Sequence, residues 1–228
     1  TFNSFCLLPA LPQQFEQPEL YTYLSGTLQV VFYKNRSKQQ MKYCSTCGTP
    51  LELRIPEGDN RLRSCCPGCN AIHYVNPKIV VGSIPTFQGK VLLCKRAIEP
   101  RYGYWTLPAG FMELNETTHQ GAERETWEEA GAKVELGPLF TMFDVIRAEQ
   151  VHIFFRAEMP TPTFCAGEES LDVKLFSEEE IPWDELAFKT VSKTLTLFFA
   201  DRKAGRYTLH TGDVFDHTDW TDSQFKAG

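Results

Sequence analysis

Three glutamates lie on one face of a predicted helix. Glu125, Glu128 and Glu129 occupy positions i, i+3 and i+4, and residues at this spacing project from the same side of an α-helix. Like charges so placed destabilise an exposed helix by about 0.2–0.5 kcal/mol per pair. A bound divalent cation would reverse the sign, and Mg2+ prefers a few carboxylates together with water and substrate phosphate oxygens. This face therefore predicts divalent metal and diphosphate chemistry.

The segment around these glutamates has the start and stop signals of a helix. Thr117 and Gln120 have the spacing of a capping box. Gly131 suits the left-handed position that ends many helices. Arg124 precedes the first of the three glutamates, and we expect it to form an ion pair with Glu116 in the preceding loop.

The order of these residues is the strongest motif in the chain. From Gly110 to Gly131 the sequence follows G-x5-E-x7-R-E-x-x-E-E-x-G. It resembles the signature of the Nudix hydrolases at every charged and glycine position and departs at two aliphatic positions, Thr126 and Ala132. We expect these departures to affect packing of the helix rather than its metal chemistry. The alternative is a solvated acidic helix face, for which residues 178–180 offer a comparison.

The resemblance implies roles for the residues of the motif. Glu125, Glu128, Glu129 and the Gly110 carbonyl would hold catalytic Mg2+ or Mn2+, while Arg124 would pair with Glu116 and orient the helix face. The general base in such enzymes often comes from a loop beyond the helix, where Glu168 and Glu169 lie. We favour Glu169, and a solvated pair of loop charges is the alternative.

Four of the eight cysteines have zinc spacing. They form two CxxC pairs separated by eighteen residues, Cys44 with Cys47 and Cys66 with Cys69. Two such turns aim four thiolates at one tetrahedral ion, and a closed site of this kind has a structural role. Cys65 adjoins the second pair but does not have the required spacing. We therefore predict a structural Zn2+ site in a small ribbon.

Composition and charge limit the class of protein. The 228 residues are 42% hydrophobic, which allows one domain of ordinary size with a small companion. A net charge of −6 argues against broad electrostatic attraction to nucleic acid. We find no long apolar run typical of a membrane span and no convincing signal peptide, so we expect a cytoplasmic protein without a membrane partner.

We expect four regions along the chain. Residues 1–40 form an extension that is either poorly ordered or upstream of the true start at Met41, with a short strand at 28–33. Residues 41–74 form the zinc ribbon, 75–204 the hydrolase domain and 205–228 a polar C-terminal tail. A homodimer formed through the ribbon is an alternative to a monomer.

Alternating and β-branched runs predict the elements of the larger domain. Strands are expected at 79–84 and 90–95, joined by a hairpin turn, and at 133–146, 151–159 and 172–176, with a last helix at 191–202. Together with the resemblance, this pattern implies an α/β fold, a Nudix α/β/α sandwich with a mixed sheet, preceded by the small four-cysteine zinc ribbon.

The resemblance extends over residues 41–203 to zinc-ribbon Nudix hydrolases, and rests also on the runs NPKIVVG, GYWTLPAGFME and GEESLDVKLFSEEEIPWDELAF. This group includes FAD and NADH pyrophosphatases. The NADH enzymes usually carry a SQPWPFP-like motif, which does not occur after Gly131. The resemblance therefore implies a pyrophosphatase for a small nucleotide substrate, either FAD, cleaved to AMP and FMN, or an ADP-ribose-like compound.

Three alternatives remain. The first is an NADH pyrophosphatase. The second is an RNA cap or 5′-end hydrolase, because a ribbon can bind nucleic acid; the acidic total charge weighs against it. The third is a noncatalytic nucleotide-sensing module, which the complete set of carboxylates weighs against.

Overall fold

The computed structural model describes residues 41–214. The predictions for residues 1–40, including the strand at 28–33, and for residues 215–228 lie outside this range. The chain separates into two compact units, with the division between Tyr74 and Val75. None of the helices within residues 41–214 is long and apolar enough to cross a membrane.

The first unit is a small antiparallel sheet with very little apolar core. Its three strands are β1 (Glu52–Arg54), β2 (Arg63–Cys65) and β3 (Ile72–His73), hydrogen-bonded in the order β1-β2-β3. The buried apolar side chains described in this unit are those of Cys44, Pro56, Cys65 and Cys66. A unit this small needs a crosslink or a metal to be stable, because it cannot bury enough apolar surface.

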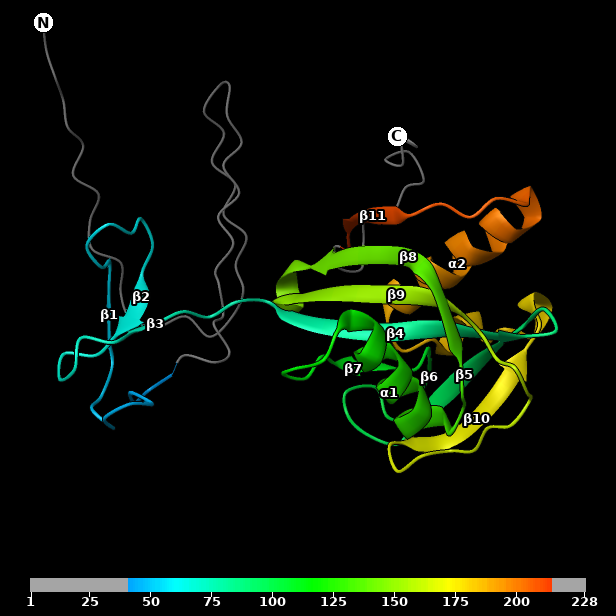
Figure 1. Cartoon of the computed structure of the whole chain (residues 1–228), viewed down its shortest axis with the longest axis horizontal. Coiled ribbons are helices and arrows are strands. Elements are labelled where there is room, and N and C mark those ends of the chain that lie inside the picture. Colours follow the sequence, from blue (N-terminus) through cyan, green and yellow to red (C-terminus); the bar gives the residue numbers. More distant parts are fainter. Residues whose placement is uncertain (1–40, 215–228) are drawn as a thin grey trace, which may run out of the picture. The chain divides into compact units, whose positions relative to one another are not determined.

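The second unit is built on an eight-stranded mixed sheet (Figure 1). Its main path is β10-β5-β4-β9-β8-β11, with β6 paired to β5 and β7 paired to β4. The pairs β4–β9 and β8–β11 are parallel and the other pairs are antiparallel. The strands are β4 (Lys78–Phe87), β5 (Lys90–Arg96), β6 (Trp105–Thr106), β7 (Ala109–Phe111), β8 (Glu135–Val145), β9 (Gln150–Glu158), β10 (Ser170–Phe176) and β11 (His210–Asp213).

The predicted hairpin is present as β4 and β5. Its turn residues Gln88 and Gly89 both have positive φ, 48° and 78°, as a two-residue turn of type I′ requires. The strands predicted at 133–146, 151–159 and 172–176 correspond to β8, β9 and β10 with small shifts at their ends.

Two α-helices accompany the sheet. Helix α1 (Thr118–Ala130) has Thr117 as its N-cap in a full capping box with Gln120, and it ends at Gly131 with φ of 56°. Helix α2 (Lys189–Ala204) is longer than the predicted 191–202 and ends at Gly205 with φ of 68°. Short 3-10 helices cover Ile146–Ala148, Glu178–Glu180 and Trp183–Glu185.

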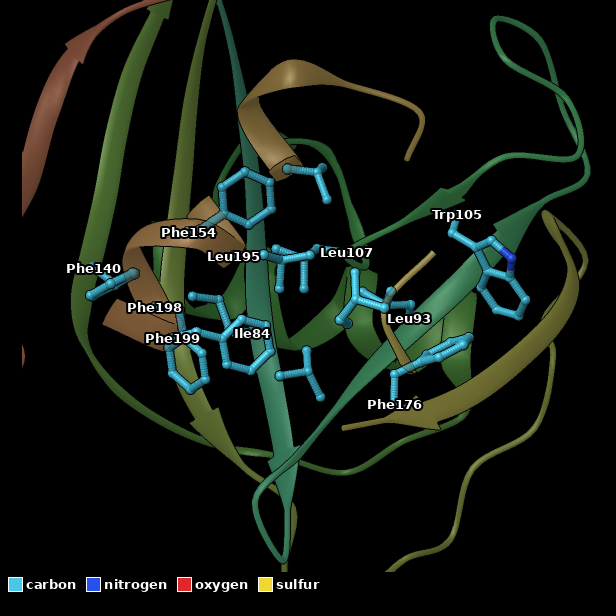
Figure 2. Packing of buried hydrophobic residues seen from close by; sticks show 13 residues of the cluster. Ile84, Leu93, Trp105, Leu107, Phe140, Phe154, Phe176, Leu195, Phe198 and Phe199 are labelled. Atoms are coloured by element: carbon cyan, nitrogen blue, oxygen red, sulfur yellow. The ribbon is translucent and has the colours of Figure 1, made fainter. Parts of the chain in front are cut away.

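The two helices cover opposite faces of the sheet. In β5, Leu92 and Cys94 pack with Ala130 at the end of α1, whereas the alternate residues Val91 and Leu93 pack with α2. The same alternation separates neighbours in the other central strands. Figure 2 shows the aromatic core on the α2 side, where Phe198 and Phe199 meet the sheet. This arrangement confirms the predicted α/β/α sandwich.

Part of the expected polar tail is a strand. β11 runs parallel to β8 at the edge of the sheet, with His210 opposite Thr141. The His210 ring lies 2.9 Å from a carboxylate oxygen of Asp201 on α2 and packs edge-to-face on Phe140 at a centroid distance of 5.2 Å. The sequence HTGD gives no strand signal. The strand forms because main-chain pairing with β8 and these side-chain contacts hold the segment in place.

Thr126, one of the two departures from the signature, is fully buried where α1 meets β4. Its Oγ1 donates to the Ala122 carbonyl oxygen at 2.7 Å and lies 2.6 Å from Oγ of Ser83, which is also fully buried. A polar pair therefore replaces an apolar contact between helix and sheet. The second departure, Ala132, is buried in the cluster around Leu92.

We predict that Thr126→Val destabilises the protein by about 1–3 kcal/mol, because it leaves the buried Ser83 hydroxyl without its partner. Ser83→Ala should cost less, since Thr126 keeps its bond to Ala122. The double variant should be less unstable than the sum of the two. Urea unfolding of all four proteins measures this, and additive effects would show that the pair does not interact.

Candidate active site and zinc centre

The four predicted zinc ligands converge in the first unit. The Sγ atoms of Cys44, Cys47, Cys66 and Cys69 all lie within 4.8 Å of one another, and they form the one such group of metal-binding side chains within residues 41–214. The Cys44–Cys69 and Cys47–Cys66 sulfur pairs are 3.6 and 3.4 Å apart. Four sulfurs at 2.3 Å from one tetrahedral zinc ion would be about 3.8 Å apart. The geometry therefore fits a closed zinc site.

Backbone amides donate to two of these four sulfurs. The N–H of Thr46 donates to Cys44 Sγ and that of Cys69 donates to Cys66 Sγ, each at 3.4 Å. Burial alone would raise the pKa of the Cys44 thiol, but hydrogen bonds from the backbone of Thr46 and Cys47 lower it to about 5. His73 adds a contact, with Nε2 3.4 Å from Cys44 Sγ.

In the second unit, α1 presents the three glutamates in very different environments. Glu125 and Glu129 are 9% and 7% exposed, whereas the side chain of Glu128 is 55% exposed. The Glu129 carboxylate accepts a hydrogen bond from the Ala109 N–H at 3.2 Å. The carboxylates do not converge to the 4.8 Å spacing of the cysteines. Glu125 and Glu129 are thus the buried pair, and Glu128 lies at the edge.

Arg124 ties the helix face to the preceding loop. Its Nε and Nη2 donate to the two carboxylate oxygens of Glu116 at 3.0 and 2.8 Å, which is the predicted ion pair in bidentate form. Its Nη1 donates to Glu125 at 2.7 Å and to Glu128 at 2.9 Å. The hydrogen bond from Arg124 lowers the pKa of Glu116 to about 2. This network fixes the orientation of the Glu125 carboxylate.

Gly110 lies directly against the Glu125 carboxylate. A Cβ at position 110 would collide with all three atoms of that carboxyl group. Gly110 is in β7, which pairs with β4 through Val81. The absence of a side chain lets the strand backbone reach the helix carboxylate, so the Gly110 carbonyl and a helix carboxylate can share one cation. The donor set is all oxygen and suits a hard divalent ion.

Burial changes the protonation of the glutamates. Loss of solvent raises the pKa of Glu129 to about 8, although the Ala109 N–H opposes this effect. Burial also raises the pKa of Glu125, against the opposing hydrogen bond from Arg124. Two buried carboxylates whose charged forms are disfavoured gain strongly from a cation that replaces lost solvation.

The loop that carries Glu168 and Glu169 is attached to the end of α1. Cys165 N–H donates to the Ala130 carbonyl at 2.8 Å and Gly167 N–H donates to the Glu129 carbonyl at 3.1 Å. A Cβ at Gly167 would collide with the Glu128 carbonyl. The charge of Glu169 contributes to the raised pKa of both Glu125 and Glu129. Glu169 is exposed and close to the buried carboxylates.

Aromatic and histidine side chains of the second unit could also contribute to a site, but those described next have structural surroundings. Trp105 is buried and packs edge-to-face on Phe176 at 4.9 Å, while Phe111 is 47% exposed with Lys78 over its ring. The His119 ring packs on the Phe155 ring in a tilted arrangement, with the centroids 4.2 Å apart. His152 lies between Thr190 and Gln150, and burial lowers its pKa to about 4.

Sequence reasoning missed two groups at this site. One is the Ala109 N–H, which no side-chain pattern reveals. The other is Arg96, whose charge acts on Glu129. It follows the apolar run VLLC and Lys95 at the end of β5, and a basic residue at the end of a buried strand is a signal that could have found it.

We predict that Glu129→Gln stabilises the protein at pH 8 when no Mg2+ or Mn2+ is added. The folded-state pKa of Glu129 is raised to about 8, so the wild-type protein loses stability as pH rises from about 4.5 to 8, where the buried carboxylate becomes charged. Glutamine removes this loss. Thermal unfolding between pH 5 and pH 8 should show curves that diverge as pH rises. Glu128→Gln, at an exposed position, is the control, and parallel curves for Glu129→Gln and wild type would contradict the assignment.

Solved structures resemble this fold. A NUDIX hydrolase from Nitrosomonas europaea has a TM-score of 0.75 and 50% identity, and the match covers 76% of this chain and 99% of that one. An ADP-ribose pyrophosphatase from Streptococcus suis has a TM-score of 0.51 and 20% identity over 60% of this chain and 99% of that one. At that identity the second likeness shows the fold alone.

Among curated relatives, a NAD-capped RNA hydrolase of Chromobacterium violaceum is 34% identical over 95 residues, which are 41% of this chain and 33% of the relative. An ADP-ribose pyrophosphatase of Methanocaldococcus jannaschii is 29% identical over 119 residues, 50% of this chain and 69% of the relative. The chain thus spans about a third of the length of the first.

Two family models match consecutive segments. The zinc-ribbon model described as "Nudix N-terminal" matches residues 42–75, and the NUDIX domain model matches residues 77–198. The second match covers more than half of the chain and contains Gly110, α1 and the loop of Glu169. The chain therefore belongs to the Nudix family and carries the family's N-terminal zinc ribbon.

Proposed function

We propose that this protein hydrolyses the diphosphate bond of a nucleoside diphosphate linked to a second moiety. One observation supports this above the others: Glu125 and Glu129 are buried side by side on α1, against Gly110 and beside Arg124. Burial of two carboxylates is unfavourable unless a cation accompanies them. A diphosphate needs such a cation to approach an acidic site in a protein of net charge −6.

The residues of the proposed site have different roles. Glu125, Glu129 and the Gly110 carbonyl would hold Mg2+ or Mn2+, with Glu128 at the exposed edge of the site. Such an ion, when bound, would neutralise the charge of the diphosphate oxygens and acidify a bound water. Arg124 and Glu116 keep the Glu125 carboxylate in place. Catalysis of this type depends mainly on positioning and on charge stabilisation.

Glu169 is our candidate for the general base. It lies on the loop attached to the C-terminal end of α1, and its charge contributes to the raised pKa of both buried glutamates. Its exposure allows it to take a proton from an attacking water molecule. The neighbouring Glu168 is exposed as well.

For the substrate we favour FAD, cleaved to AMP and FMN, or an ADP-ribose-like compound. The relative from Methanocaldococcus jannaschii is named an ADP-ribose pyrophosphatase, and the match covers 69% of it. The SQPWPFP-like motif that marks NADH pyrophosphatases does not occur after Gly131. Both favoured compounds contain an adenosine diphosphate half.

NAD-capped RNA is the second candidate. The NAD-capped RNA hydrolase of Chromobacterium violaceum is 34% identical over the matched 95 residues. The cap has the same diphosphate bridge as the small dinucleotides, so the same carboxylates could serve. The net charge of −6 disfavours a long RNA footprint.

A panel of substrates tests the proposal. The purified protein with Mg2+ or Mn2+ is incubated with FAD, ADP-ribose, NADH and NAD-capped RNA, and products are identified by mass. We expect AMP with FMN from FAD, or AMP with ribose 5-phosphate from ADP-ribose. Release of NMN from capped RNA at a higher kcat/KM would favour the second candidate. Negligible turnover of all four would leave a nucleotide-sensing module and overturn the enzyme assignment.

Glu169→Gln should lower kcat by about 100-fold or more, because general bases typically contribute 100- to 10,000-fold. Metal affinity should change little, since Glu169 is not among the proposed ligands. Glu168→Gln is the matched control and should retain activity. Full turnover by Glu169→Gln with normal metal binding would remove this residue from the mechanism.

A further inference from the structure

Arg96, the last residue of β5, is a buried cation. It is 9% exposed. Its Nε donates to the Pro100 carbonyl at 2.9 Å, and its Cζ lies 5.0 Å from the centroid of the Phe188 ring. Its backbone N–H and carbonyl bond to Tyr104 and Gly103, each at 2.9 Å. These contacts fix both the position of the residue and the plane of the guanidinium group.

The guanidinium has unused donors. Arginine offers five N–H groups, and within residues 41–214 the Nε bond to Pro100 is the one hydrogen bond that the Arg96 side chain makes. No carboxylate in this part of the chain lies within ion-pair distance of it. Buried charged groups are normally paired, because loss of hydration is otherwise uncompensated. The terminal nitrogens of Arg96 are therefore suited to bind an anion.

Arg96 lies at the edge of the proposed active site. The Glu129 backbone carbonyl accepts a hydrogen bond from the Gly167 N–H at 3.1 Å, and the Gly167 carbonyl accepts one from the Ser170 N–H at 3.1 Å. The next residue, Ala97, donates its N–H to the Glu169 carbonyl at 2.8 Å. The end of β5 is therefore joined to the loop of the candidate base, and that loop is joined to α1 at Glu129.

Ser170 adds a hydroxyl donor at the same place. It lies directly opposite Arg96 in the pairing of β10 with β5, so the two side chains start from the same face of the sheet. Its Oγ is buried and has no nitrogen or oxygen partner within residues 41–214. Its neighbour is the thiol of Cys94, whose pKa it lowers through a side-chain hydrogen bond while burial raises it. Sulfur is a weak acceptor, so a phosphate oxygen would be a stronger partner for this hydroxyl.

We propose that the terminal nitrogens of Arg96 bind non-bridging oxygens of one phosphate group of the substrate, with the Ser170 hydroxyl as a neighbouring donor. The planar fork of a guanidinium matches two phosphate oxygens, which a lysine ammonium does not. The inference rests on the proposed function. It assigns one phosphate contact to Arg96, a cation of the chain itself, on the side of the site where Glu129 and Glu169 lie.

The contact would act in the hydrolysis itself. The water oxygen forms a bond to one phosphorus, the bond from that phosphorus to the bridging oxygen breaks, and the electron pair stays on the leaving phosphate. The water proton passes to the Glu169 carboxylate. A fixed cation beside phosphate oxygens on which negative charge accumulates lowers the barrier without needing to reorient.

A different role would be indirect: Arg96 would only offset the charge of Glu129 and so position a metal ligand. The two roles differ in what they affect. Loss of a phosphate contact weakens binding of AMP and leaves Mn2+ affinity unchanged, whereas loss of a positioning charge changes Mn2+ affinity first.

The test uses Arg96→Lys, which keeps the charge and removes the fork, and Arg96→Met, which removes both. Arg156→Lys is the matched control, because Arg156 also stacks on an aromatic ring, with Cζ 4.2 Å from the Tyr207 centroid, and lies on β9, away from these groups in the sheet order. AMP binding and Mn2+ binding are measured by calorimetry, and kcat and KM are measured on the best substrate of the panel. Circular dichroism checks folding.

We expect Arg96→Lys to weaken AMP binding about tenfold and to lower kcat/KM about 100-fold, with Mn2+ affinity unchanged and Arg156→Lys like wild type. Unchanged AMP affinity in Arg96→Lys would overturn the assignment. A loss of AMP affinity that a loss of Mn2+ affinity fully explains would also overturn it, as would a wild-type protein that does not bind AMP. Wild-type protein that binds AMP through Arg96 but cleaves no substrate would contradict the proposed function alone. If Arg96→Met does not fold, the lysine variant still decides the outcome.

Discussion

The structure of the second unit depends on the close contact between α1 and β7. Gly110 has no side chain, so the backbone of β7 approaches the helix closely enough to lie against the Glu125 carboxylate. The same contact buries Glu129, which takes one hydrogen bond from the neighbouring Ala109 N–H. Two carboxylates are thereby removed from water at the place where a strand carbonyl is available. The unfavourable burial is the physical reason to expect a divalent cation there.

Other parts of the fold hold this contact in place. Arg124 connects Glu125, Glu128 and the loop residue Glu116 in one hydrogen-bonded network. The loop of residues 165–169 bonds to the carbonyls at the C-terminal end of α1, where Gly167 permits a close approach. Elsewhere along its buried face, α1 is held by the bond of Thr126 to Ser83 of β4. The first unit is stabilised differently. Its four zinc-binding thiolates replace a hydrophobic core that the ribbon is too small to form.

The local signals in the sequence predicted much of this. The capping box at Thr117, the stop at Gly131 and the hairpin turn at Gln88 and Gly89 act over a few residues, and the structure has each of them. The cysteine spacing predicted the four-sulfur cluster for the same reason. The mixed sheet and the sandwich came from the resemblance, because periodicity cannot show which strands pair.

Features that depend on distant contacts were not predictable. Strand β11 has polar residues and exists through pairing with β8 and the His210–Asp201 contact. The different burial of Glu128 and Glu129 follows from where β7 and the 165–169 loop lie, and their adjacent positions in the sequence do not reveal it. The contact of the Arg96 guanidinium with the Phe188 ring requires the end of β5 and the start of α2 to meet.

Proton release on metal binding tests the central claim most directly. If Mn2+ binds at the buried carboxylates, Glu129 must lose the proton that its raised pKa of about 8 retains at neutral pH. Calorimetric titrations at pH 7 in buffers of different ionisation enthalpy should then show release of about one proton per ion. The release should fall toward zero at pH 9 and vanish in Glu129→Gln. A binding enthalpy that does not depend on the buffer at pH 7, or the same proton release in Glu129→Gln, would contradict the account.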